Sequence, residues 1–166
     1  MRCFGDGDPP YAAYHDWEWG RPVTDERGLF ELICLQGFQA GLSWLTVLRR
    51  REGMRQAFAG FDPEAVAGFG PPEVERLLAD SGVIRQRAKI EAVIANARAT
   101  LALRGGAGLA RLVWSFRPEP APAPAAWTGL PAQTAESRAL ARELPRHGFR
   151  FVGPTTAYTG AWPTAR

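Results

Sequence analysis

Aromatic rings and two side-chain amides gather in the first quarter of the chain. The stretch CLQGFQAGLSW, residues 34–44, ends a helical apolar pattern and then loses its period around Gln36, Gln39 and Trp44. Several rings crowd together in this part of the sequence, namely Phe4, Tyr11, Tyr14, Trp17, Trp19, Phe38 and Trp44. Flat rings with a few hydrogen-bonding groups suit a pocket for a planar heterocycle, such as a base flipped out of DNA. Each ring taken alone is more often part of a hydrophobic core, so the sequence leaves both interpretations open.

A second group of candidate functional residues, which could bind an anion, lies in ADSGVIRQRAK, residues 79–89. We expect Gly82 to end one helix and to take the positive φ of a tight reversal. The amides of the reversal and of the next helix start point outward, which makes an anion site. Arg85, Arg87 and Lys89 lie beside it, as a DNA backbone phosphate would require. The alternative is an ordinary helical hairpin with a basic surface.

The composition permits nucleic acid binding without establishing it. The 166 residues carry a formal net charge of +3, and Lys89 is the only lysine beside many arginines. This pattern fits either a phosphate-binding face or a genomic bias towards arginine codons. No Gly-rich phosphate loop or pair of catalytic carboxylates supports a metabolic enzyme. Two cysteines, no secretory leader and no membrane-length apolar run predict a reduced, cytoplasmic protein that does not associate with membranes.

The elements that must position these residues are predicted to be helices, so the expected fold class is all-α. Residues 1–23 are expected to form an irregular, aromatic-rich arm. Helices are predicted from Thr24 or Asp25 to Leu35, from Leu42 to Phe58, from Pro63 with Asp62 as its N-cap, and over 71–81, 86–103, 108–116 and 133–144. The run RPEPAPAPAAW, residues 117–127, should be extended and mobile. The segment FRFV is too short to imply a sheet.

Longer motifs make the chain recognisable as a member of a family. The stretches RCFGDGDPPYAAYHDWEWGRPVTD, LFELICLQGFQAGLSWLTVLRRRE, GVIRQRAKIEAVIANARA, VWSF and GFRFVGPTTAY together resemble the 3-methyladenine DNA glycosylase I (Tag) family. The resemblance covers nearly the whole chain, from Cys3 to about Tyr158. It implies a single helix-hairpin-helix DNA glycosylase domain over residues 1–166, with the hairpin unit at about 73–101. Such a protein flips N3-methyladenine out of double-stranded DNA and hydrolyses its glycosidic bond, as a monomer and without a cofactor for catalysis.

The resemblance also implies roles for single residues. The residues expected to carry catalysis are Gln36, Tyr14 and Trp44. The resemblance adds Phe4 to the base pocket, and the clustering of rings and amides adds Tyr11, Trp19 and Gln39 as expected pocket residues. The residues expected to grip the DNA backbone are Gly82, Arg85, Arg87 and Lys89. The family counterpart of Lys89 forms no Schiff base, so a monofunctional enzyme without strand cleavage is expected.

The chain departs from the family pattern at Gln36, where the family usually has glutamate. Glutamine keeps one acceptor, adds a donor and loses the charge that attracts a cationic base. Gln36 Oε1 can therefore do the same work, or the pocket can prefer another, bulkier adduct. A degenerate homologue that binds DNA without excising a base is the remaining alternative.

The second departure concerns a structural zinc that the family carries. Cys3 and His15 match the N-terminal half of its ligand set, but no His or Cys follows His147. The chain stops where the family's final helix should begin, so the C-terminal half of the zinc site is expected to be missing. Two ligands do not close a tetrahedral site. His147 is expected at the surface and Cys34 in the core.

Overall fold

The part of the chain that the structure describes is helical. The computed structural model describes residues 7–119 and 133–161. Its elements are α1 (Pro9–Trp17), α2 (Glu26–Phe38), α3 (Trp44–Ala57), a 3-10 turn η1 (Ala59–Phe61), α4 (Pro63–Ala67), α5 (Pro71–Ala79), α6 (Arg87–Leu103), α7 (Leu109–Ser115), α8 (Ala135–Arg146) and α9 (Pro154–Ala161). These described residues form no strand, which confirms the all-α prediction, and none of their helices is long and apolar enough to cross a membrane. Most of the Pro/Ala-rich run 117–127 lies outside the described residues.

Polar caps start several of the helices, and the sequence predicted two of these caps, Asp25 and Asp62. Asp25 caps α2, and its carboxylate accepts a hydrogen bond from the backbone N–H of Gly28 at 2.8 Å. Asp62 caps α4 in the same way, with Pro63 at the first helical position. Ser43 caps α3, so that Trp44 becomes the first residue of that helix. Each cap satisfies a backbone donor that the helix itself cannot pair, which fixes where the chain turns.

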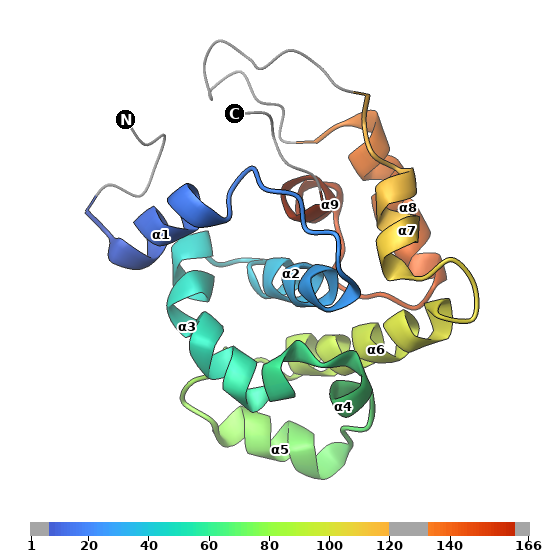
Figure 1. Cartoon of the computed structure of the whole chain (residues 1–166). Coiled ribbons are helices and arrows are strands. Elements are labelled where there is room, and N and C mark those ends of the chain that lie inside the picture. Colours follow the sequence, from blue (N-terminus) through green and yellow to red (C-terminus); the bar gives the residue numbers. More distant parts are fainter. Residues whose placement is uncertain (1–6, 120–132, 162–166) are drawn as a thin grey trace.

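The central helix of the molecule is α2 (Figure 1). It lies between α9 and α6, and it also contacts α3 and α7. Phe30 of α2 meets Phe61 edge to face, with ring centroids 6.1 Å apart, and Phe61 stacks on Phe58 at 5.5 Å. All three rings are fully buried, and burial of one such side chain contributes about 1.5–3 kcal/mol. Core packing therefore fixes the helix that carries Gln36.

The expected irregular arm is partly wrong, because residues 9–17 form α1. Pro9 and Pro10 occupy its first positions, where a missing N–H costs no hydrogen bond and the proline φ suits a helix. A Pro-containing stretch is therefore compatible with a helix when its prolines stand at the first positions. Tyr14 is the buried residue of this helix. Figure 1 shows α1 beside the first turns of α3, so this part of the arm packs on α3 as a helix.

The sequence prediction also missed α9, close to the C-terminus. Its residues PTTAYTGA are mostly small or polar and carry no apolar period. Ala157 is buried, and the helix packs against α2 and α8. The contact with the central helix holds these residues helical, which local propensity alone does not predict.

Candidate active site

Tyr14 of α1 and Trp44 at the start of α3 lie in contact. Their ring centroids are 5.4 Å apart at an interplanar angle of 63°, an edge-to-face arrangement. Tyr14 is 8% exposed and Trp44 is 9% exposed, so solvent reaches little of either ring. The structure thus brings together two of the three residues predicted to carry catalysis.

Gln36 lies in the last turns of α2 and is only 5% exposed. Its neighbour Leu35 lines a cavity of about 180 Å³ together with Tyr14 and Trp44. Gln36 itself is not among the residues that line this cavity. The end of α2 therefore reaches the ring pair through Leu35, while the contact of Gln36 with a base stays a prediction.

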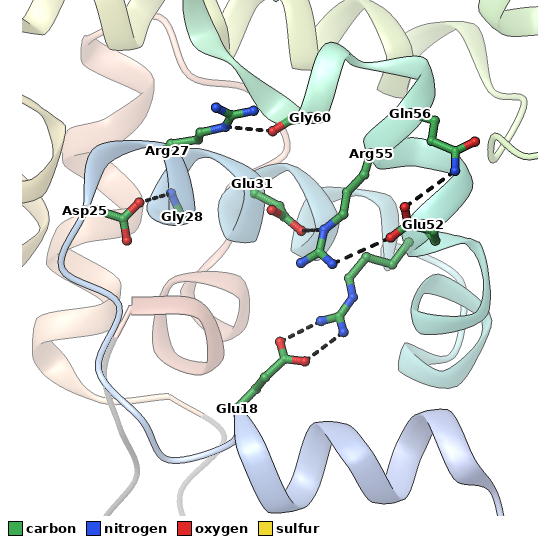
Figure 2. A network of polar contacts seen from close by, with 10 residues as sticks. Glu18, Asp25, Arg27, Gly28, Glu31, Glu52, Arg55, Gln56 and Gly60 are labelled. Carbon is green, nitrogen blue, oxygen red and sulfur yellow. Dashed lines mark hydrogen bonds and ion pairs between the residues drawn. The ribbon is translucent and has the colours of Figure 1, made fainter.

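Charged side chains form another part of the cavity wall. Arg51 of α3 donates two hydrogen bonds to Glu18, at 2.6 and 2.7 Å. Arg55 donates one to Glu31 of α2 at 2.7 Å, and Figure 2 shows this pair beside Glu18. Each carboxylate in the wall is thus balanced by a guanidinium group.

Sequence reasoning missed these charged residues, although their spacing carried a signal. Glu18 follows Tyr14 by one helical turn, and Arg51 follows Trp44 by two. Residues at these spacings share one helix face. A ring pair and an ion pair therefore connect the same two faces of α1 and α3.

Burial and the nearby Glu18 carboxylate raise the pKa of Tyr14 to about 12, against a smaller opposing effect of Arg51. Removing the phenol from water disfavours its anion, and the negative neighbour disfavours it further. Tyr14 therefore keeps its proton at neutral pH. It can donate a hydrogen bond or pack its ring, but it is no base.

The other predicted pocket residues surround α1 and the end of α2. Tyr11 and Trp19 are partly buried, and His15 stacks on Trp19 with ring centroids 5.6 Å apart. Gln39 caps α2, and its backbone N–H donates to Gln36 O at 3.1 Å. Phe4 lies outside the described residues. The roles of these four residues in base recognition stay predictions.

The α5–α6 turn, residues 80–86, lies where the sequence predicted it, but Gly82 is needed there for another reason than the predicted one. Gly82 does not have a positive φ, and α5 already ends at Ala79 with Asp80 as its C-cap. The glycine is needed because α3 lies close. A Cβ on Gly53 would lie 2.7 Å from Gly82 O, and a Cβ on Gly82 would lie 3.3 Å from Gly53 Cα. Two glycines therefore let the turn pack backbone to backbone against α3.

The predicted basic residues of this turn divide into exposed and buried. Arg85 is exposed, and Arg87 is exposed but paired with Glu75 at 2.6 Å. Lys89 is only 6% exposed, and its ammonium group donates to Phe38 O at 2.9 Å and to Ala40 O at 2.5 Å. Burial lowers the pKa of Lys89. The prediction that Lys89 contacts DNA at the surface is wrong, because its charge is used inside the protein.

The sequence profile of the methyladenine glycosylase family matches residues 4–161, and therefore nearly the whole chain. This chain belongs to the methyladenine glycosylase family. The match includes both helices that carry the ring pair and the whole α5–α6 unit.

Individual relatives agree with the family profile. DNA-3-methyladenine glycosylase 1 of Escherichia coli (strain K12) is 49% identical over 156 residues, which cover 92% of this chain and 83% of the relative. DNA-3-methyladenine glycosylase of Haemophilus influenzae is 44% identical over 152 residues, which cover 89% and 82%. A crystal structure of 3-methyladenine DNA glycosylase I (TAG) superposes with a TM-score of 0.90 at 50% identity, covering 96% of this chain and 90% of that one. These likenesses confirm the predicted family and its helical fold.

The zinc site expected of a methyladenine glycosylase is not formed by the described residues. Residues 7–119 and 133–161 hold no group of three or more His, Cys, Asp or Glu side chains that could bind a metal ion. His15 contacts Asp16 at 3.0 Å, and His147 lies on the surface beside Glu143 at 3.1 Å. Cys3 lies outside the described residues. Since His15 is the one expected ligand in the described part, it does not by itself fit a closed tetrahedral site.

Proposed function

We propose that this methyladenine glycosylase excises N3-methyladenine from double-stranded DNA by flipping the base into a pocket beside Tyr14, Gln36 and Trp44. The observation that carries the proposal is the buried ring pair, which lies next to the end of the helix bearing a buried amide. The E. coli and H. influenzae relatives are named for activity on this base.

The geometry of the ring pair restricts how a base can bind. With centroids 5.4 Å apart at 63°, Tyr14 and Trp44 touch each other, so no base fits between them. The base must stack on one ring while the other meets its edge. We assign the stacking face to Trp44, because an indole offers the larger surface and attracts a cationic heterocycle.

The proposed reaction is hydrolysis of a bond that alkylation has already weakened. Methylation at N3 places positive charge on the adenine. When the N9–C1′ bond breaks, its electron pair neutralises the departing base. Water adds to C1′ and releases a proton. The pocket has to select and orient the base, and positioning with electrostatic stabilisation can supply this without a protein nucleophile or a cofactor.

The environment of Lys89 supports hydrolysis without strand cleavage. A Schiff-base nucleophile must present a free amine to the sugar. The Lys89 amine is buried and engaged with two backbone carbonyls. Borohydride should therefore trap no covalent complex with abasic DNA.

Contact with the DNA backbone is proposed for the α5–α6 turn. Arg85 is exposed just before the start of α6, where the positive end of a helix favours a phosphate. The turn's own amides contribute less than the sequence predicted, because the N–H groups of Gly82 and Val83 donate to Asp80. Arg87 can join only by giving up its pairing with Glu75.

We also propose that the protein acts as a cytoplasmic monomer. Light scattering with and without duplex should report one protein per DNA site.

The test is base release from N-methylated duplex DNA by the wild type and by Gln36→Glu, with the released base identified by chromatography. Release of 3-methyladenine by the wild type, well above the uncatalysed rate, is expected. Release only by Gln36→Glu would mean that the pocket is retuned to another adduct. Release by neither protein would contradict the proposed function.

A further inference from the structure

The backbone at the end of α2 leaves two carbonyl groups without an amide partner. A helix cannot pair its last carbonyls internally. Between residues 35 and 40, the carbonyls of 35, 36, 37 and 39 accept hydrogen bonds from backbone N–H groups of the following turn. Those of Phe38 and Ala40 do not, and they are the two carbonyls that Lys89 Nζ contacts. The side chain therefore completes the α2 terminus.

Lys89 suits this task in both charge and position. An ammonium group donates up to three hydrogen bonds, and positive charge is favourable at the negative end of a helix dipole. The adjoining cavity, which Phe38 and Lys89 line, is about 10 Å³. That is at or below the space one water needs. The Phe38 carbonyl therefore has little room for a water molecule beside it while Lys89 is in place.

The residues on either side of this contact belong to the two halves of the proposed site. Lys89 lies in the first turn of α6, directly after the α5–α6 turn. The α2–α3 turn that it holds, residues 39–43, separates Gln36 from Trp44. The buried side chain of Lys89 thus connects the turn proposed to bind the DNA backbone with the segment between Gln36 and Trp44.

We propose that Lys89 is a positioning residue that holds the α2–α3 turn, and with it Gln36 and Trp44, in place relative to the DNA-binding turn of α5 and α6. This inference rests on the proposed function for its consequence in base release. Its structural part, the support of residues 39–43 by one side chain, stands independently.

The experiment compares Lys89→Met with Arg98→Met in the full chain. Arg98 lies on the same helix and also donates to two backbone carbonyls, Ala67 O and Phe69 O, both at 3.1 Å. Those carbonyls lie away from the α2–α3 turn, so the control removes a similar bridge without touching the pocket. Single-turnover base release, undamaged-duplex binding and hydrogen exchange of residues 39–43 are measured for both variants and the wild type.

Lys89→Met should release base about 30-fold more slowly, bind undamaged duplex within about twofold of wild type, and exchange faster over residues 39–43. Arg98→Met should match wild type in release and in the exchange of those residues. Wild-type release by Lys89→Met would overturn the proposal, as would equal exchange in the two variants. If the wild type released no base, the proposed function would fail, and hydrogen exchange alone would decide the role of Lys89.

A milder pair keeps the test decisive if Lys89→Met does not fold. Lys89→Gln keeps an amide donor but is shorter and uncharged, and Arg98→Gln is its control. Lys89→Gln should show the same loss of release and the same faster exchange, to a smaller degree. Release and exchange equal to those of Arg98→Gln would overturn the proposal.

Discussion

Tyr14 and Gln36 approach the proposed base site from helices that are attached to the molecule in different ways. On α1, Tyr14 is the buried residue, and the ion pairs Glu18–Arg51 and Asp8–Arg49 connect this helix to α3. On α2, every residue from 33 to 38 is buried, and a buried ammonium group completes its end. One side of the site therefore depends on partly exposed charges and the other on core packing. Changes of charge should loosen the α1 side first.

The largest expected effect on base release comes from changing Trp44, which contacts Tyr14 of α1 and follows the end of α2 in the chain. Trp44→Ala removes the proposed stacking face and the support of the Tyr14 ring. Base–aromatic stacking contributes about 1–3 kcal/mol, so release should fall on the order of 100-fold. Binding to undamaged duplex should stay nearly unchanged, because the flipped base is the one part of the DNA that the ring would touch. Trp44→Phe is the control, and an equal loss of undamaged binding would contradict this placement of Trp44.

Alkaline pH should distinguish the α1 side by its effect on stability. The folded-state pKa of Tyr14, about 12, lies above the unfolded value near 10. The stability that the protonated Tyr14 contributes to the folded state is fully present below pH 10. It is lost as the pH rises through 12, and the loss amounts to about 2–3 kcal/mol of the free energy of unfolding. Urea unfolding at pH 9 and 11.5 should show a smaller alkaline loss for Tyr14→Phe than for wild type. Tyr11→Phe, on the same helix, is the control, and equal losses in Tyr14→Phe and wild type would refute the assignment.

The ion pair that docks α1 should matter less than either ring. The Glu18 side chain is 41% exposed, and such a pair contributes about 1 kcal/mol. Arg51→Met should therefore slow base release about fivefold. Glu18→Gln combined with Arg51→Met should be no slower than Arg51→Met alone, because both changes break the same pair. Additive losses in this double-mutant cycle would mean that the two residues act separately.

The smallest expected effect lies outside the pocket. Arg85→Ala should weaken binding to damaged and undamaged duplex alike, by about threefold, and reduce the salt slope by about one. Release at saturating enzyme should be unchanged. A loss confined to damaged DNA would place Arg85 in base recognition instead of at the backbone.

The sequence predicted those parts of the fold that local chemistry determines. Asp25 and the pair Asp62–Pro63 mark helix starts because a side chain next to the helix pairs its first amides. The sequence prediction failed at α1, where the prolines stand at favourable first positions of a helix, and at α9, where contacts with α2 and α8 decide. The sequence prediction also ended α2 at about Leu35, three residues early, and nothing nearby in the sequence shows that Lys89 pairs the carbonyls of Phe38 and Ala40.

For the site, the sequence identified residue types better than their surroundings. Tyr14 and Trp44, which the sequence singled out from a cluster of rings, glycines and amides, lie in contact, while their role in base recognition stays a prediction. Gly82 was recognised as necessary for the wrong reason, because only the structure shows how closely Gly53 approaches. Lys89 looked exposed within a basic stretch. Its helical spacing to the buried Val93 and Asn96 was the signal that placed it on an inward face.

A crystal structure with free 3-methyladenine bound would test the central claim most directly. The account predicts the heterocycle stacked on Trp44, with Tyr14 at its edge and the Gln36 amide within hydrogen-bonding distance. A base bound away from Trp44, or one that Gln36 does not reach, would contradict it.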